Sequence, residues 1–327
     1  MLRVINPDVE IWHQEGFSID AIWKHIARCA RVCYQSVPKD KNESPYDFVK
    51  RTLLRGVDVI NVPYTFDDIR GSHLSVLEHG TVHLKYPSFM ARAEALFSAT
   101  LRGNKYSKWN IHEGYIYVTT NMRVIIETNW IDQLEFIDKT PNCPYYYDRT
   151  TVNFITNIGV SRELNRHRCH SISEESTRYC SYNKDKFGNN ITVTKVPWID
   201  YTTNELNDGD CYEGKLLPDS EVYNEDINRI IYQHTGYWTA IDWYLYSLSI
   251  ANITYCKLRE FGWSAQQARD VLPLATKTQV VHTAFNDDWK QWIALRAEQI
   301  SGKVQPELLE LSLKLRDLLS YGNYSKN

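Results

Sequence analysis

Segments with helical periodicity alternate with segments of strand-like character along the chain, and this alternation restricts the fold class more than any other feature. Residues 19–31 carry apolar side chains at helical spacing, and residues 82–86 alternate as a half-buried strand does. The stretches 152–160 (VNFITNIGV) and 278–285 (TQVVHTAF) are rich in β-branched and aromatic residues, which favours strands. No internal repeat or low-complexity linker interrupts the pattern. We therefore predict a mixed α+β fold, in a single domain spanning residues 1–327.

Several further elements follow from local signals. Helices are predicted at 45–54, which Ser44 and Pro45 open, and at 89–101. A strand is predicted at 115–127, and a short helix is predicted to begin with Ser161 as its N-cap. The stretch 183–214 is polar and rich in Asn, Asp, Thr and Gly, which predicts an irregular excursion.

Charge and cysteine usage exclude several classes of protein. The 37 Lys and Arg residues against 40 Asp and Glu residues give a net charge of −3, so a positively charged site must be local and general nucleic-acid binding is not expected. The seven cysteines are scattered and never form a CxxC pair, which favours reduced thiols over disulfides or structural zinc. No signal sequence and no run of 18 apolar residues occurs. We predict a cytoplasmic protein that binds neither nucleic acid nor membrane.

Two helical segments near the C-terminus place an arginine on an otherwise apolar face. Arg269 lies in the stripe of SAQQARDVLPL, and Arg296 continues the tryptophan face of NDDWKQWIALRAE. Burying an unpaired guanidinium group is costly, so each arginine needs a carboxylate, backbone carbonyls or an anionic ligand. Pairing with an internal acid explains either arginine alone equally well. The two together, with the arginines of the next segment, favour a planar anionic ligand.

The segment RHRCHSISEESTRY, residues 166–179, gathers charged, hydroxyl and aromatic side chains. Arg166-His167-Arg168 is followed after seven residues by Ser176, and Arg178 comes two residues later. A solvated surface run needs no such hydroxyls and aromatic ring, and a core strand does not tolerate the charges. The segment is therefore interpreted as the lining of an anion-binding site.

The R-H-R-x7-S pattern resembles the signature of the flavin-dependent thymidylate synthases. Four other blocks resemble that family in the same order: ARCARVCYQS (27–36), HLSVLEHGTVHL (73–84), ARDVLPL (268–274) and DWKQWIALRAE (288–298). Relative to the shortest members of the family, the region around 87–150 looks like an insertion, and residues 183–260 match no block.

The resemblance implies the reductive methylation of deoxyuridine monophosphate (dUMP) to dTMP. Methylenetetrahydrofolate would supply the carbon, and FAD reduced by NADPH would supply the hydride. The implied fold has a central, mainly antiparallel sheet flanked by helices, and the implied assembly is a homotetramer with shared active sites. The substrates are small molecules, and no metal site is expected.

The resemblance also assigns roles to individual residues. The residues expected to bind dUMP are Arg162, Glu163, Glu174, Ser176, Arg178, Arg269 and Arg296. Those expected to bind FAD are His79, Arg166, His167, Arg168, Glu174 and Gln291. The catalytic candidates are Arg296, Ser176 and His79: Arg296 would stabilise charge on the uracil, His79 would lie near the isoalloxazine, and Ser176 would bind phosphate. A nucleophilic serine needs an adjacent base, so Ser176 is not expected to attack the ring. Glu163 departs from the family, in which many members have glutamine.

Five alternatives remain open at this stage. His167, Cys169 and His170 are a conceivable metal site, although their spacing is poor without a helix. The Arg-His-Arg run is a conceivable RNA contact or an ordinary solvated basic stretch. An enzyme of this type with another pyrimidine nucleotide as substrate, and a non-catalytic nucleotide sensor, would carry much the same residues.

Overall fold

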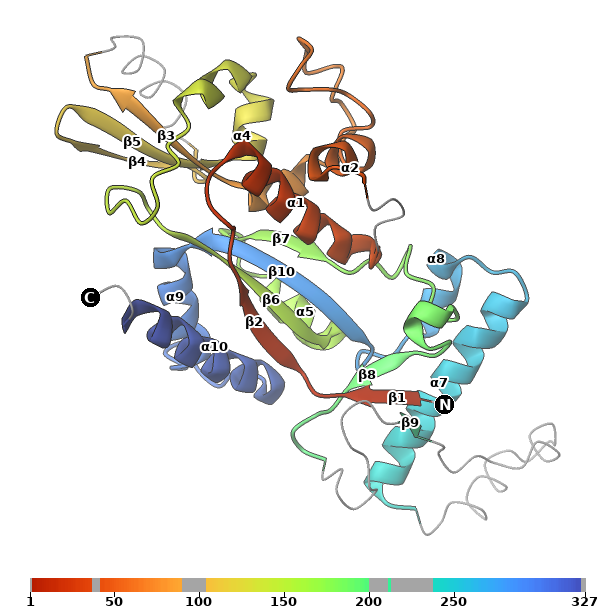
Figure 1. Ribbon diagram of the computed structural model, residues 1–327. Coiled ribbons are helices and arrows are strands. Elements are labelled where there is room, and N and C mark those ends of the chain that lie inside the picture. The colour runs from red at the N-terminus through yellow and green to blue at the C-terminus, as the bar shows by residue number, and fades with distance from the viewer. Residues whose placement is uncertain (1, 37–41, 90–103, 200–210, 213–237, 325–327) are drawn as a thin grey trace. The chain divides into compact units, whose positions relative to one another are not determined.

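A computed structural model describes residues 2–36, 42–89, 104–199, 211–212 and 238–324 (Figure 1). The chain divides into two compact units, each assembled from separate stretches. The first unit comprises 1–8, 155–162 and 176–278, and the second comprises 9–154, 163–175 and 279–327. The prediction of a single domain with an insertion around 87–150 and an excursion around 183–214 stays a prediction.

Two predicted helices begin the core of the second unit. Helix α1 (Ile19–Tyr34) starts where the Ser18 hydroxyl accepts a hydrogen bond from the backbone N–H of Ala21, and helix α2 (Pro45–Thr52) is capped by Ser44 in the same way. The apolar face of α1, including Ile22 and Ile26, is fully buried. Both helices confirm the sequence prediction, because the capping and periodicity signals are local.

A three-stranded sheet packs against these helices in the order β3-β5-β4. It consists of β3 (Thr81–Pro87), β4 (Lys108–His112) and β5 (Tyr115–Asn121), with β5 antiparallel to both neighbours. The predicted strand 115–127 is too long, because helix α4 (Met122–Glu127) replaces its second half. The reason is the side chain of Asn121, which accepts a hydrogen bond from the backbone N–H of Val124 and caps that helix.

The region around 87–150 supplies much of this core. Ile116, Val118, Met122 and Ile125 lie in one buried cluster with the apolar face of α1. A short 3₁₀ helix, η2 (Ile131–Phe136), completes the region. Residues 90–101 of the predicted helix 89–101 lie outside the described part of the chain.

The second sheet has the strand order β2-β6-β10-β7. Its strands are β2 (Asp8–Trp12), β6 (Arg149–Asn157), β7 (Ser171–Glu174) and β10 (Lys277–Phe285), and β7 runs antiparallel to β10. The strand predicted at 278–285 is confirmed. Figure 1 shows α1 on one side of this sheet and α9 (Asn286–Arg296) with α10 (Pro306–Tyr324) on the other.

Strand β6 ends earlier than predicted, because helix α5 begins at Ile158 and runs to Leu164. Ser161 is therefore not the N-cap. The side-chain oxygen of Asn157 accepts a hydrogen bond from the backbone N–H of Val160, at 2.9 Å, and so performs the capping role. The hydroxyl of Ser161 instead donates to the carbonyl of Ile158 inside the helix.

The first unit is built around a small sheet and a long helix. Strand β1 (Leu2–Ile5) pairs in parallel with β8 (Thr192–Thr194) and antiparallel with β9 (Cys211–Tyr212). Helix α7 (Ala240–Glu260) packs Leu245 and Leu248 into its core. The described part of 183–214 therefore includes two short strands and a 3₁₀ turn, η3 (Asp185–Phe187), besides irregular chain.

The last elements of the first unit carry predicted site residues. Helix α8 (Ala265–Ala268) opens with the predicted capping box of Ser264 and Gln267, and the 3₁₀ turn η5 (Arg269–Val271) follows. Among the described residues, no helix is long and apolar enough to cross a membrane. The mixed class with mainly antiparallel pairing is confirmed, and β1 with β8 forms a parallel exception.

Candidate functional site

The signature segment lies where α5 gives way to a turn and then to β7. Backbone hydrogen bonds from Arg166 to Glu163, from His167 to Leu164 and from His170 to His167 wind this connection tightly. Strand β7 then pairs with β10 up to Glu174. Arg166 and His167 therefore lie on the connection, and Glu163 lies in the last turn of α5.

Arg296 is held in the second unit by the signature segment. Its Nε–H donates to Nε2 of His167 at 3.0 Å, and its side chain is 20% exposed. Burial, and then the positive charge of Arg296, lower the pKa of His167 to about 4. The imidazole is therefore neutral near pH 7, with Nε2 as acceptor and its proton on Nδ1. This hydrogen bond uses only the Nε–H of the guanidinium group.

Glu163 is the acid nearest to both arginines of this group. Its carboxylate lies 3.9 Å from Nη1 of Arg296 and 3.6 Å from Nη1 of Arg166. Both distances are too long for hydrogen bonds, and the Arg166 side chain is 72% exposed, so these ion pairs contribute little stability. The arginines are partly neutralised, and their Nη groups keep most of their hydrogen-bonding capacity.

A second group of predicted residues gathers in the first unit. The hydroxyl of Ser176 accepts a hydrogen bond from the backbone N–H of Arg178 in the turn that follows β7. Nε of Arg178 donates to the side-chain oxygen of Gln266 on α8, at 3.1 Å. Gln266 and Arg269 are three residues apart on one helical path, which places them on the same face. The sequence analysis did not identify Gln266 as a site residue, although its position three residues before Arg269 indicates that both lie on the same helical face.

Neither arginine of this first-unit group is neutralised. Within the described part of the chain, neither Arg178 nor Arg269 makes an ion pair. The described partners of the Arg178 side chain are the neutral amide of Gln266 and the ring of Tyr179, 5.4 Å from the guanidinium carbon, and Arg269 is half-buried. Arg178 at the serine turn and Arg269 on the Gln266 face supply two guanidinium groups without an ion pair among the described residues, a composition suited to an anion.

The remaining cofactor and nucleotide candidates are more exposed. Arg162, Arg168 and Gln291 are on the surface, and none of their side chains has a hydrogen bond or ion pair among the residues that the structure describes. Glu174 is half-buried and accepts a hydrogen bond from Nδ2 of Asn165 at 2.8 Å. Asn165 is a further contact that the sequence analysis did not identify.

His79 is fully buried in the second unit. Its Nδ1 lies 2.7 Å from Oγ1 of Thr283, and its Nε2 lies 2.9 Å from Oγ of Ser173. Burial holds the pKa of His79 well below its ordinary value. The preceding Glu78 is also buried and forms an ion pair with Arg123. The ring has no surface exposed to solvent in this unit, and its assignment to the flavin stays a prediction.

The predicted set is thus divided between the two units. Arg162, Ser176, Arg178 and Arg269 belong to the first, and the second contains His79, Glu163, Arg166, His167, Arg168, Glu174, Gln291 and Arg296. In the described ranges, no cluster of three or more His, Cys, Asp or Glu side chains has the arrangement of a metal site.

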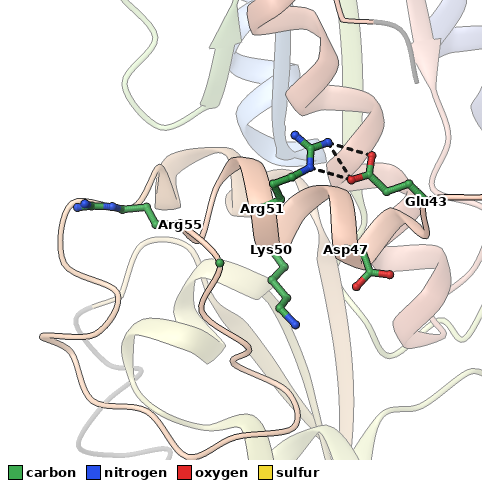
Figure 2. A pocket seen from close by; sticks show the side chains of 6 residues that line it. Glu43, Asp47, Lys50, Arg51 and Arg55 are labelled. Carbon is green, nitrogen blue, oxygen red and sulfur yellow. Dashed lines mark hydrogen bonds and ion pairs between the residues drawn. The ribbon is translucent and has the colours of Figure 1, made fainter. Parts of the chain in front are cut away.

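A surface cavity of about 440 Å³ lies elsewhere in the second unit. It is lined by Glu43, Asp47, Lys50, Arg51, Arg55 and Gly56. Figure 2 shows Arg51 directed at Glu43, and the ion pair between them measures 2.8 Å. Lys50 is paired with Asp58 at 2.9 Å. Most of the charged side chains that line the cavity are thus paired with other residues of the protein, and none of the predicted site residues lines it. The cavity is therefore not assigned to the functional site.

Comparisons with known proteins point to one family. The family model described as thymidylate synthase complementing protein matches residues 148–320, more than half of the chain. A comparison with curated proteins finds no match. A solved structure of a UMP/dUMP methylase, PolB from Streptomyces cacaoi bound with 5-Br dUMP, is 20% identical with a TM-score of 0.34, covering 53% of this chain and 67% of that chain. The same methylase bound with 5-Br UMP is 19% identical with a TM-score of 0.34, covering 53% and 69%. Scores this low define neither fold nor function.

Proposed function

The chain belongs to the flavin-dependent thymidylate synthase family, described as thymidylate synthase complementing protein, and we propose that it converts dUMP to dTMP by reductive methylation. Methylenetetrahydrofolate would be the carbon donor, and FAD reduced by NADPH the hydride source. Membership of this family supports a methyltransferase of the thymidylate synthase type. We further propose a cytoplasmic homotetramer with shared active sites.

The observation that carries this proposal is the group of Ser176, Arg178 and Arg269. Arg178 is exposed, and its Nε–H donates to the neutral amide of Gln266 and not to an acid among the described residues. That contact leaves the Nη groups of Arg178 to donate to a phosphate dianion, and the hydroxyl proton of Ser176 is a further donor. This is the assignment that the family resemblance gives to the same three residues.

Arg296 is proposed to act on the uracil ring. Negative charge accumulates on the uracil carbonyl oxygens when C5 becomes nucleophilic, and a fixed guanidinium group stabilises that charge. The neutral ring of His167 accepts a hydrogen bond from the Nε–H of Arg296 and so orients the guanidinium group. Both Nη groups of Arg296 then remain to donate to the uracil base. Glu163, where many members have glutamine, is proposed to lie near the nucleotide with its charge offset by Arg166 and Arg296.

Some of the residues proposed to bind FAD have side chains suited to the cofactor, and others do not. Arg166 and Arg168 are exposed guanidinium groups suited to a diphosphate, and Gln291 offers at the surface of α9 an amide that has no partner among the described residues. Both nitrogens of His79 are occupied, so it offers no free ring nitrogen within this unit. A bound flavin would supply the hydride chemistry, and the protein would supply binding and orientation.

The test combines a spectrum with an assay. The purified protein is expected to absorb at roughly 450 nm, as flavins do, and to release tritium from C5-labelled dUMP only when methylenetetrahydrofolate and NADPH are present. Arg296→Lys is the matched variant, because it keeps the charge and loses the planar fork, and it should lower turnover more than binding.

Three outcomes would overturn or redirect the proposal. A colourless protein that still binds dUMP would favour a nucleotide sensor. Tritium release from labelled uridine monophosphate but not from dUMP would favour the other pyrimidine substrate. The absence of both flavin and nucleotide binding would refute the assignment.

A further inference from the structure

Five buried side chains form one continuous hydrogen-bonded chain in the second unit. His25 on α1 contacts Oγ1 of Thr151 on β6 at 2.9 Å, and that oxygen lies 2.7 Å from Oγ1 of Thr283 on β10. Thr283 contacts Nδ1 of His79 at 2.7 Å, and Nε2 of His79 reaches Ser173 on β7 at 2.9 Å. None of the five residues is more than 4% exposed.

The proton count of these groups permits only two arrangements. Each hydroxyl has a single proton, and each neutral imidazole has a single N–H. Thr151 and Thr283 each sit in two links of the chain, and neither hydroxyl has another partner among the described residues, so each donates in one link and accepts in the other. Reversing any one link therefore reverses all of them.

The two arrangements assign the same tautomer to both histidines. If His25 donates from Nε2, the chain runs through Thr151 and Thr283 to Nδ1 of His79, which then carries its own proton on Nε2 and donates to Ser173. If Ser173 donates to Nε2 of His79, every link reverses, and both rings carry the proton on Nδ1. Both rings are neutral near pH 7, because burial lowers the pKa of His25 to about 4 and that of His79 well below its ordinary value.

We propose that Thr151, Thr283 and Ser173 are positioning residues that orient His79 and couple its tautomer to the tautomer of His25. The coupling is a property of the unliganded chain and stands without the proposed function. Its catalytic consequence rests on the proposed function, in which His79 lies beside the flavin and its tautomer decides whether it donates or accepts there.

The direct test is nitrogen NMR of the wild-type protein labelled with ¹⁵N-histidine near pH 7.5. The shifts of Nδ1 and Nε2 report which nitrogen of each ring carries the proton. We expect His25 and His79 to show the same tautomer. Opposite tautomers in the two rings would overturn the proposal without any variant being made.

A second test follows the coupling along the chain. Thr151→Val removes a hydroxyl that does not touch His79, and we expect it to shift the ring ¹⁵N signals of His79. The same substitution should leave them unchanged in a Thr283→Val background, because the connection is already broken. Thr156→Val is the matched control, since Thr156 is a buried threonine of the same strand whose hydroxyl has no partner in the described chain. Unchanged His79 signals in Thr151→Val would contradict the coupling.

Turnover supplies a readout that separates this inference from the proposed function. Thr283→Val is expected to lower kcat about tenfold at unchanged KM for dUMP, less than the roughly 100-fold or more that a direct general acid–base group contributes, because the substitution removes the orientation of His79 and keeps its ring. Thr283→Ser keeps the hydroxyl and should restore kcat, and Thr156→Val should not change it. An inactive wild type with matched tautomers would refute the function alone, and an active enzyme with opposite tautomers would refute the coupling alone. Equal kcat in Thr283→Val and wild type would refute the positioning role.

Discussion

Replacement of His83 by phenylalanine is expected to make the protein less sensitive to acid. His83 on β3 is 5% exposed and is stacked between Phe17 and Tyr146, with ring centroids 3.8 Å and 4.0 Å away. Within the described structure, neither of its ring nitrogens has a hydrogen-bond partner. The ring therefore behaves as an aromatic packing group that also carries two unsatisfied polar atoms.

The sign of the pH effect follows from the direction of the pKa shift. Burial lowers the pKa of His83 from 6.5 to about 3, Asp138 opposes this shift, and Arg149 adds to it. The unfolded chain therefore binds a proton below about pH 6.5 that the folded chain does not bind until about pH 3, so stability is lost as the pH falls through this window. At about 1.4 kcal/mol per pH unit, the loss from this one group is about 2 kcal/mol at pH 5.

Urea unfolding followed by circular dichroism at pH 7.5 and pH 5.0 measures this loss. At pH 7.5 the His83→Phe variant should be within about 1 kcal/mol of wild type, because removing two unpaired nitrogens offsets the slightly larger ring. Between the two pH values it should lose about 2 kcal/mol less stability than wild type. The other buried histidines titrate in both proteins, so the difference isolates His83.

A matched control uses the other stacked histidine of this sheet. His112 on β4 stacks on Tyr145 at 3.9 Å, but its side chain is 37% exposed. His112→Phe makes the same exchange at an exposed position, so it measures at pH 7.5 the effect of the ring exchange without burial. If His83→Phe and wild type lose equal stability on acidification, the argument from burial is refuted.

Three other substitutions test the packing and the site. Gly80→Ala should lower the free energy of unfolding in urea by about 1–3 kcal/mol, because the added Cβ would lie 2.5 Å from Cδ1 of the buried Ile26. A stability equal to that of wild type would show that α1 does not pack this closely against residue 80. His167→Phe should lower kcat with dUMP by an amount equivalent to about 1–2 kcal/mol of activation free energy, because Arg296 loses its hydrogen-bond acceptor. His167→Gln keeps an acceptor at the position of Nε2 and should have a kcat near that of wild type. Equal losses of kcat in the two variants would refute the orienting role of His167. Arg178→Ala should weaken dUMP binding by about 2–4 kcal/mol in calorimetry, and an unchanged affinity would remove it from the phosphate site.

Local signals predicted the elements of this fold better than their ends. The helix from Ile19 and the strand at 278–285 were predictable because capping and periodicity act within a few residues. The strand at 115–127 was predicted too long, because Asn121 reads as an ordinary strand residue until its side chain is seen capping the next helix. The capping by Asn157 instead of Ser161 is the same kind of error. Division of the chain into two units depends on long-range contacts, and no local pattern indicates them.

Residue types at the site were predictable, but their partners were not. The Arg-His-Arg run and the arginines in apolar stripes indicated an anionic ligand, and for these residues that interpretation stays a prediction. The hydrogen bond between His167 and Arg296 joins residues far apart in the sequence, so it required coordinates. The same is true of Gln266 as the partner of Arg178, and of the two hydroxyls that enclose His79.

The strand order of the second sheet has a consequence for synthesis on the ribosome. Strand β10 lies between β6 and β7, yet it is the last of the four strands to be translated. Until residue 285 has left the exit tunnel, β7 has no neighbour to pair with, and one edge of β6 is open to other strands. The nascent polypeptide therefore completes this sheet only late in translation, and the open edge of β6 is prone to aggregation during that interval.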